Sequence, residues 1–331
     1  MTFSELKTFV ARFQSVLALS LLVLGLSLAT DRFMTLDNTL NVLRQISINV
    51  CLSIGMTMII LSGGIDLSVG SMLALSGAVA AGLMKNGVTL EHFGVQLQFT
   101  CLGGIVAALV VGTLLGTCNG LAITRFKLPP FVATLGMLSI ARGFTMLWTG
   151  GFPITSLGDD FATIGTGYVF RINDDYPGIP MPVCIAAVLV GLFIVVTQRT
   201  RFGRYLYAIG GNERAAQLSG IDVPRAKLLV YALGGMLSGV AGLLVTSRLD
   251  SATPNAGTGY ELDSIAAVVI GGTSLSGGRG SIWGTVLGCL IIGVLNNGMV
   301  LMQVSPFWQQ VVKGVVIIVA VAIERVNRTE S

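Results

Sequence analysis

Charged side chains are scarce in this sequence. Asp, Glu, Lys and Arg together make up 11% of its 331 residues, whereas hydrophobic residues make up 53%. A soluble globular protein carries roughly 25% charged residues, so the composition excludes a water-facing surface over most of the chain. The sequence therefore predicts a protein that is surrounded mainly by lipid.

Catalytic and metal-binding patterns are also missing. The sequence has a single histidine, His92, and its five cysteines are scattered through apolar runs without the spacing of metal ligands. Neither a G-x-x-x-x-G-K-S/T phosphate loop nor a G-x-S-x-G nucleophile elbow occurs. We therefore expect no catalytic residues, no metal, no cofactor bound by this chain and no nucleic-acid partner, which favours a transporter subunit over an enzyme.

Long uncharged runs fill most of the sequence, as in VLALSLLVLGLSLAT (16–30). A membrane-crossing helix needs about 20 mainly apolar residues. Runs that are apolar on every face fit helices rather than the short alternating strands of a membrane barrel. We predict an all-α polytopic membrane protein with one transmembrane domain over residues 1–331. About ten transmembrane helices are expected, at 14–30, 42–62, 67–84, 98–123, 131–149, 181–198, 226–246, 262–274, 282–300 and 308–324.

Basic residues between these runs indicate the orientation of the chain. Lys and Arg favour the cytoplasmic loops of membrane proteins. When the N-terminus is placed in the cytoplasm, most loop arginines, including Arg125, Arg199 and Arg214, fall on the cytoplasmic side as well. An even number of crossings then returns the C-terminus to that side, so we predict that both termini are cytoplasmic.

The stretch RTRFGRYLYAIGGNERAAQLSGI (199–221) is unusually basic for this chain. Within it, Asn212 is a good N-cap, Glu213 suits the positive first turn of a helix and Gly220 is placed as a C-terminal stop. We predict a short capped helix inside a cytoplasmic loop at 199–225. Two interpretations stay open: a rigid docking contact for a cytoplasmic partner, or a helix at the lipid headgroups whose arginines only fix the orientation.

The stretch GGIDLSVGS (63–71) interrupts the apolar pattern with polar residues. Its two glycines can end one helix, and its aspartate can cap the next helix at the N2 or N3 amides. The sequence therefore predicts a break between the second and third helices near the inner surface, as either a capped tight turn or part of an inner gate. GGTSLSGGRGS (271–281) has a similar pattern and is expected at the same face. The candidate gate residues are Gly63, Gly64, Asp66, Ser68 and Ser71.

Ionisable residues inside the predicted spans are few. Arg44, Arg142 and Lys313 fall within spans, whereas Asp66 and Asp263 lie at helix ends. Ion-coupled carriers commonly bear acids deep inside their helices, so this pattern disfavours a self-sufficient carrier. We expect the energy for transport to come from a partner outside this chain.

Four long stretches carry a resemblance to a known family. They resemble the membrane subunits of the ribose-type family of bacterial ABC sugar transporters, and their order and spacing match along nearly the whole chain. The N-terminal end and the outer loop at 150–180 match least. The stretches are ILSGGIDLSVGSMLALSGAVAA (60–81), RFKLPPFVATLGML (125–138), AIGGNERAAQLSGI (208–221) and GTGYELDSIAAVVIGGTSLSGGRGSIWGT (257–285).

This resemblance implies a permease of the bacterial inner membrane, with two copies of the chain lining one pathway. It also implies a cytoplasmic ATP-binding subunit, which would hold ATP and Mg, and a periplasmic sugar-binding protein that delivers the substrate. Ribose is the leading substrate, with allose, xylose and galactose as alternatives, and a self-sufficient secondary carrier is the alternative from another class. The coupling role implied by the resemblance falls on Asn212, Glu213, Arg214, Ala215, Ala216, Gln217 and Leu218.

Polar residues near the apolar spans are candidates for the transport pathway. A neutral sugar needs hydroxyl, amide and aromatic partners rather than charge. Amides are costly against lipid, so they are expected to face neighbouring helices or the pathway. Either interhelical hydrogen bonds or substrate contacts would account for them. The candidates are Gln45, Asn119, Asn296 and Asn297.

Overall fold

Helices form most of the structure, a computed structural model that describes residues 3–90, 94–171 and 178–329. His92 lies outside these residues. Each of the predicted membrane segments contains a helix, although several bounds differ from the predicted ones. These helices are α1 (Phe3–Ala29), α2 (Leu36–Leu61), α3 (Val69–Asn86), α4 (Cys101–Arg125), α5 (Pro130–Thr149), α7 (Met181–Arg199), α10 (Val223–Leu249), α11 (Tyr260–Ile270), α12 (Ile282–Leu301) and α13 (Pro306–Thr329).

Among the described residues, six helices are long and apolar enough to cross a membrane: α2, α4, α5, α7, α10 and α12. Shorter apolar stretches at Ser15–Ala29 and Pro306–Ala322 lie in α1 and α13. The chain is therefore a multi-pass membrane protein. The predicted span at 262–274 differs from the others because α11 has only 11 residues. At 1.5 Å per residue it extends about 16 Å, against about 30 Å for the hydrocarbon core.

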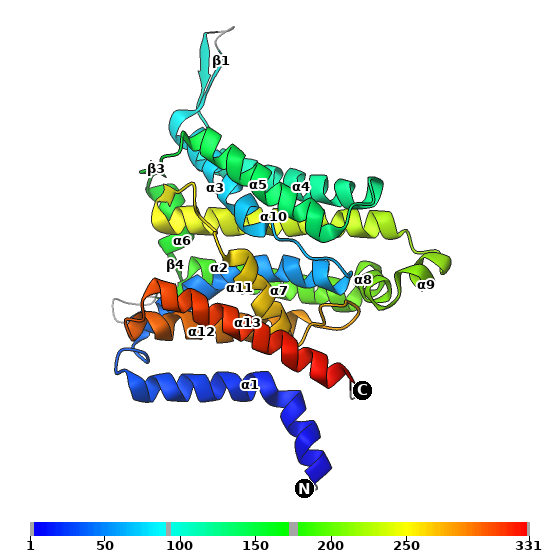
Figure 1. The fold of residues 1–331 in the computed structure, drawn as a ribbon. Helices are drawn as coiled ribbons and strands as arrows, with labels where there is room; N and C mark the ends of the chain where they lie inside the picture. The colour runs from blue at the N-terminus through cyan, green and yellow to red at the C-terminus, as the bar shows by residue number, and fades with distance from the viewer. Residues whose placement is uncertain (1–2, 91–93, 172–177, 330–331) are drawn as a thin grey trace.

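Short strand pairs lie at the end of the molecule opposite α8 (Arg201–Gly211) and α9 (Glu213–Leu218), as Figure 1 shows. α6 (Asp159–Thr166) lies at the same end as the strands, within the predicted outer loop. The basic loop and the predicted outer loop are thus at opposite ends. The antiparallel pairs are β1 (Val88–Leu90) with β2 (Val95–Leu97), β3 (Ile154–Thr155) with β6 (Ser251–Ala252), and β4 (Tyr168–Val169) with β5 (Ile179–Pro180).

Two helices, α3 and α11, begin inside the molecule rather than at one of its ends (Figure 1). After α2 the chain returns as an irregular segment at 62–68 and starts α3 near the centre. A second irregular segment, at 253–259, enters from the opposite end and starts α11. The two helix starts meet, because a Cβ added to Gly70 would overlap the carbonyl oxygen of Gly257. We call this contact the half-helix crossing. Membranes tolerate such breaks where they are buried in protein or line a cavity.

The packing of α2–α5 and of α10–α13 follows one inverted pattern. α3 packs against α10, α4 and α5, and α11 packs against α2, α12 and α13. α4 in turn packs against α10, as α12 packs against α2. Since α2 and α10 run in opposite directions (Figure 1), the two groups of helices form inverted repeats. In transporters built this way, substrate sites lie near the interface of the repeats at the membrane midplane.

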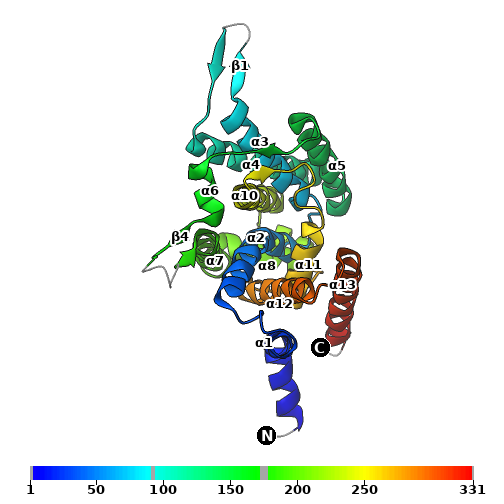
Figure 2. The same ribbon diagram turned by 90° about the vertical axis from the view of Figure 1, so that its left-hand side faces the viewer.

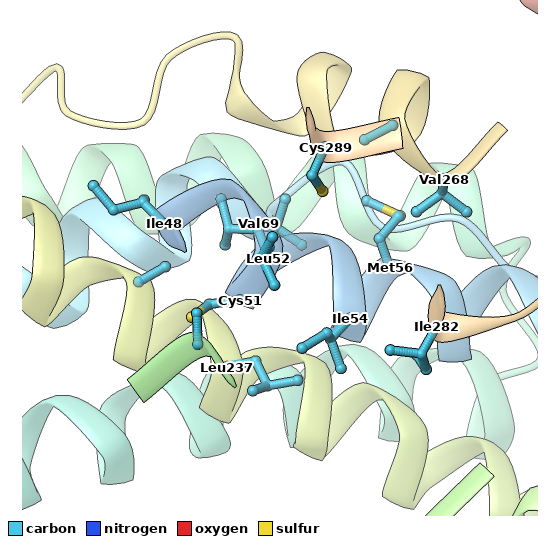
Figure 3. Packing of buried hydrophobic residues seen from close by; sticks show 14 of the residues in the cluster. Ile48, Cys51, Leu52, Ile54, Met56, Val69, Leu237, Val268, Ile282 and Cys289 are labelled. Atoms are coloured by element: carbon cyan, nitrogen blue, oxygen red, sulfur yellow. The ribbon is translucent and has the colours of Figure 1, made fainter. Parts of the chain in front are cut away.

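The apolar core is built around α2. In the most apolar 18-residue stretch of this helix, 78% of the residues are buried. Figure 3 shows how Leu52 and Met56 of α2 pack among Leu237, Val268 and Cys289 from α10, α11 and α12. The interior thus joins both inverted repeats in one cluster, which fixes the position of the half-helix crossing.

The peripheral helices keep many large apolar side chains exposed. Phe144 of α5, Leu192 of α7 and Ile318 of α13 are examples, and α5 and α13 lie at the edge of the molecule in Figure 2. Soluble proteins rarely expose extended apolar patches. These surfaces are therefore suited to contact lipid or another membrane subunit.

Candidate functional site

The basic loop forms a helical segment, residues 200–222, which we call the coupling segment. Its second helix, α9, begins after Asn212, whose Oδ1 accepts a hydrogen bond from the amide of Ala215 at 2.9 Å. Gly220 has a φ of +84° just beyond the helix end. The predicted short capped helix is confirmed. The preceding helix, α8, was not predicted, although Thr200 caps it by accepting from the amide of Gly203 at 3.2 Å.

α9 is fixed on one face and exposed on the other. Ala216 is buried in a small cluster with Ile209 and Val223. Glu213 forms an ion pair of 2.7 Å with Lys227 of α10. Leu218, by contrast, is 77% exposed at the end of the helix. Apart from Ala216, all residues of the predicted coupling set are exposed, so the anchored helix presents an exposed surface to its surroundings.

The end of α8 contacts the turns that follow α2 and α11. The amide of Gly278 donates a hydrogen bond of 3.1 Å to the carbonyl oxygen of Leu61. A Cβ added to Gly210 would overlap both that oxygen and the nitrogen of Gly278. Tyr207 also donates from Oη to the carbonyl oxygen of Gly280 at 2.9 Å. Partial burial raises the pKa of the Tyr207 hydroxyl further above neutral pH, where a tyrosine is already protonated and able to donate. We call this contact region the glycine junction.

The two glycine turns have the same local geometry. Gly63 and Gly272 have φ values of +79° and +86°, each just after a helix end. In each turn the next amide, that of Gly64 or Thr273, bonds back to a carbonyl of the preceding helix. The turns at 63–71 and 271–281 thus share a geometry, although it is shifted by one residue from the sequence resemblance, because Gly63 matches Gly272 rather than Gly271. The predicted break after the second helix is confirmed.

Asp66 lies in the irregular segment before α3 and is completely buried, with 0% exposure. Its Oδ1 accepts from the amide of Ser68 at 2.8 Å, so it caps the turn that leads into α3 rather than the predicted N2 or N3 amide. Asn119 of α4 donates to Oγ of Ser68 at 2.9 Å. Gly64 faces Tyr231 of α10, because a Cβ there would overlap the Tyr231 hydroxyl. Ser71 is also buried, so Asp66, Ser68 and Ser71 lie at the start of α3, whereas Gly63 and Gly64 form the turn after α2.

Arg142 of α5 holds the segment that leads into α11. Its Nη1 donates to the carbonyl oxygens of Pro254 and Ala256 at 2.6 and 2.9 Å. Oε1 of Glu261 accepts from the amide of Gly259 at 3.2 Å. The backbone groups at 254–259 lie outside any helix, so they have no helical hydrogen-bond partners, and lipid offers none. The side chains of Arg142 and Glu261 supply partners for three of them. These bonds therefore fix the half-helix crossing from the α11 side.

A cavity of about 120 Å³, which we call the polar pocket, lies between α2, α11, α12 and α13. Its central charged pair is Lys313 and Asp263, with Nζ 2.8 Å from Oδ2. The predicted pathway residues Gln45 and Asn296 both line it. The other lining residues are Ile46, Asn49, Tyr260, Gly293, Val300 and Gln309.

Helical spacing could have indicated this pocket from the sequence. Gln45 and Asn49 are four residues apart on α2, and Gln309 and Lys313 are four apart on α13. Residues four apart share one face of a helix, so each pair forms a polar patch in an apolar run. The sequence does not reveal that these two faces meet, because that depends on how α2 and α13 pack.

The other two predicted pathway amides lie elsewhere. Asn119 contacts Ser68, as described above. Asn297 exchanges two hydrogen bonds with Asn38 of α2, at 2.8 and 3.0 Å between amide nitrogen and oxygen. The four predicted amides therefore do not share one site. Among the described residues, no group of three or more His, Cys, Asp or Glu side chains could hold a metal ion.

Comparisons with known proteins identify the family. Residues 38–321 match the family described as branched-chain amino acid transport system / permease component. The ribose import permease protein RbsC of Bacillus subtilis (strain 168) is 48% identical over 315 residues, which cover 93% of this chain and 91% of that protein. The protein of the same name from Haemophilus influenzae is 46% identical over 321 residues, covering 96% and 94%.

A relative with another substrate in its name is more distant. The D-allose transport system permease protein AlsC of Escherichia coli (strain K12) is 39% identical over 310 residues, which cover 94% of this chain and 90% of that protein. No solved structure matches this chain significantly. The match over residues 38–321 and the helical membrane architecture show that this chain belongs to the family of transport-system permease components.

Proposed function

We propose that this chain is the membrane-spanning subunit of an ATP-driven importer for ribose. The observation that carries the proposal is the identity of 46–48% to two ribose import permeases over more than nine-tenths of the chain. The allose permease, at 39%, is more distant, so another monosaccharide is the second candidate. The family's general description names branched-chain amino acids, but the relatives reported above are named for sugars.

The proposed complex contains two copies of this chain in the bacterial inner membrane, with both termini in the cytoplasm. A periplasmic sugar-binding protein delivers the substrate, and a cytoplasmic subunit binds ATP and Mg. That subunit docks on the coupling segment. The rigid α9, with Leu218 exposed at its end, supports this assignment, because a stiff element transmits a rigid-body movement better than a flexible loop does.

The glycine junction gives the proposed complex a route from ATP hydrolysis to the pathway. Movement of α8 acts on the turns after α2 and α11 through Gly210 and Gly278. The first of these turns leads into α3, and the second follows α11. Displacement of the two turns would separate the helix starts at the half-helix crossing, which we propose as part of the inner gate together with the predicted gate residues.

Reconstitution tests the proposed function directly. Proteoliposomes that contain this chain, its ATP-binding subunit and its sugar-binding protein are expected to import radiolabelled ribose only when ATP is supplied. Allose and xylose, measured in parallel, test the alternative sugars. Uptake of ribose by this chain alone, without ATP or partners, would instead show a self-sufficient carrier.

A further inference from the structure

The polar pocket contains an amide group whose hydrogen bonding the protein leaves incomplete. Oδ1 of Asn296 is buried and accepts no hydrogen bond from any described residue. A buried carbonyl without a donor is destabilising, so the Asn296 side chain would gain from a donor in the pocket, which its oxygen reaches only when the side chain turns from its position in this structure. Asn297, its neighbour in the sequence, makes two hydrogen bonds to Asn38. Of these two neighbouring asparagines, only the one that lines the pocket has a side-chain oxygen without a donor.

The lining chemistry matches a molecule with many hydroxyl groups. Four carboxamide side chains line the pocket: Gln45, Asn49, Asn296 and Gln309. A carboxamide both donates and accepts hydrogen bonds, and so does each hydroxyl of a sugar. Some of this capacity is used inside the protein, since Ser264 bonds to Asn49 and Gln309 donates to the carbonyl oxygen of Val304. The oxygen of Asn296 is not used in this way.

The charges of the pocket favour a neutral ligand. Lys313 and Asp263 are already paired at 2.8 Å, so the lining carries no net charge. A zwitterionic amino acid would have to break this pair to obtain partners for its own charges, and separating a partly buried ion pair is costly. A neutral polar molecule needs no such exchange.

The position of the pocket fits a transport pathway. It is lined by α2 from one inverted repeat and by α11, α12 and α13 from the other. Tyr260 and Asp263, in the first turn of α11, place it beside the half-helix crossing. Its volume of about 120 Å³ is several times the space that one water molecule requires.

We propose that the polar pocket is a binding site for a neutral polyhydroxyl molecule of monosaccharide size, occupied while the sugar crosses the permease. This inference rests on the proposed function. The Asn296 side chain turns toward the cavity so that its Oδ1 accepts a hydrogen bond from a sugar hydroxyl, and the Asp263–Lys313 pair stays closed beside it. A sugar that the sugar-binding protein has selected is thus bound a second time, inside the membrane.

The test compares Asn296→Leu with Asn38→Ala in the complete reconstituted complex. Asn296→Leu keeps the branched shape of the side chain but removes the unpaired carbonyl. We expect it to lower ribose uptake per ATP hydrolysed about tenfold, the effect of losing one hydrogen bond. The same variant should leave thermal stability unchanged or raise it, because a buried unpaired oxygen is removed. The control Asn38→Ala breaks the pair with Asn297, so it should lower thermal stability while uptake per folded complex stays at the wild-type value.

Gln45→Leu is measured in parallel, because it removes a second amide from the pocket, and it should also lower uptake. Wild-type uptake by both pocket variants would overturn the proposed site and leave the proposed function intact. A loss of uptake by Asn296→Leu that only follows a loss of stability would overturn it too, since Asn296 would then have a structural role. Failure of the wild-type complex to import ribose would overturn the proposed function itself.

Discussion

The amide of Gly278 donates a hydrogen bond of 3.1 Å to the carbonyl oxygen of Leu61. This bond joins the turn after α11 to the last residue of α2, and the end of α8 packs against both groups at Gly210. The end of α2 and the turn after α11 are thus held together at Gly210 of the coupling segment. A small displacement of α8 acts on both turns at once.

Gly210→Ala should disrupt the glycine junction. The added Cβ would overlap the oxygen of Leu61 and the nitrogen of Gly278, and backbone atoms cannot move aside as a flexible side chain can. We expect a loss of about 1–3 kcal/mol in the free energy of unfolding, typical of overpacking, and ribose uptake uncoupled from ATP hydrolysis. Gly211→Ala is the matched control, because a Cβ at Gly211 meets nothing within 4 Å. Equal behaviour of the two variants in thermal melting and uptake would contradict the role of the junction.

Leu218→Arg should abolish binding of the ATP-binding subunit without unfolding the permease. The side chain is 77% exposed, so the substitution costs little in the free protein, whereas a docking surface would lose an apolar contact and gain an unpaired charge. Phe152→Arg is the control: this residue is also 77% exposed and lies just before β3, which is at the opposite end of the molecule (Figure 1). Co-purification with the ATP-binding subunit measures the effect. Normal co-purification of Leu218→Arg would place the docking surface elsewhere.

The Asp263–Lys313 pair should show strong coupling in a double-mutant cycle. Lys313→Met leaves the largely buried carboxylate of Asp263 without its partner and should lower the free energy of unfolding by about 3 kcal/mol. Adding Asp263→Leu removes the isolated charge and should restore most of that loss. Thermal melting of both single variants and the double variant checks this, and additive effects would show that the two groups do not interact.

Gly70→Ala should force α3 and α11 apart. Its Cβ would overlap the carbonyl oxygen of Gly257 and lie 2.6 Å from Oε2 of Glu261. We expect lower thermal stability and loss of ribose uptake, because the half-helix crossing cannot close. Gly136→Ala, in α5, meets nothing within 4 Å and should behave as the wild type. Wild-type uptake and melting of Gly70→Ala would show that the close approach is not required.

Local features of the sequence were sufficient to predict the ends of α9 and the break after α2. Asn212, Gly220 and Gly63 act on their own neighbours within a few residues, through a side-chain cap or a positive φ, so no distant contact is needed to recognise them. Apolar run length likewise predicted the positions of the membrane helices. At α11 the predicted segment, 262–274, continues past the helix, which ends at Ile270, since composition does not show where a glycine turn ends a helix.

The candidate site was predictable only in part. Gln45 and Asn296 were identified as polar groups in apolar runs, but so were Asn119 and Asn297, which bond to Ser68 and Asn38 instead. The sequence does not separate these cases, because a paired and an unpaired amide look the same in an apolar run. Only the packing of the helices determines which amide finds a partner.

By itself, the sequence determined that this chain lies in a membrane as a bundle of helices, and where several of those helices end. These properties follow from composition and from caps and glycines, which act over short distances along the chain. The tertiary structure decided that Leu61 meets Gly278, that Gly70 meets Gly257, and that Lys313 closes on Asp263 beside Asn296. Each of these contacts joins helices far apart in the sequence, so its existence depends on the path of the whole chain.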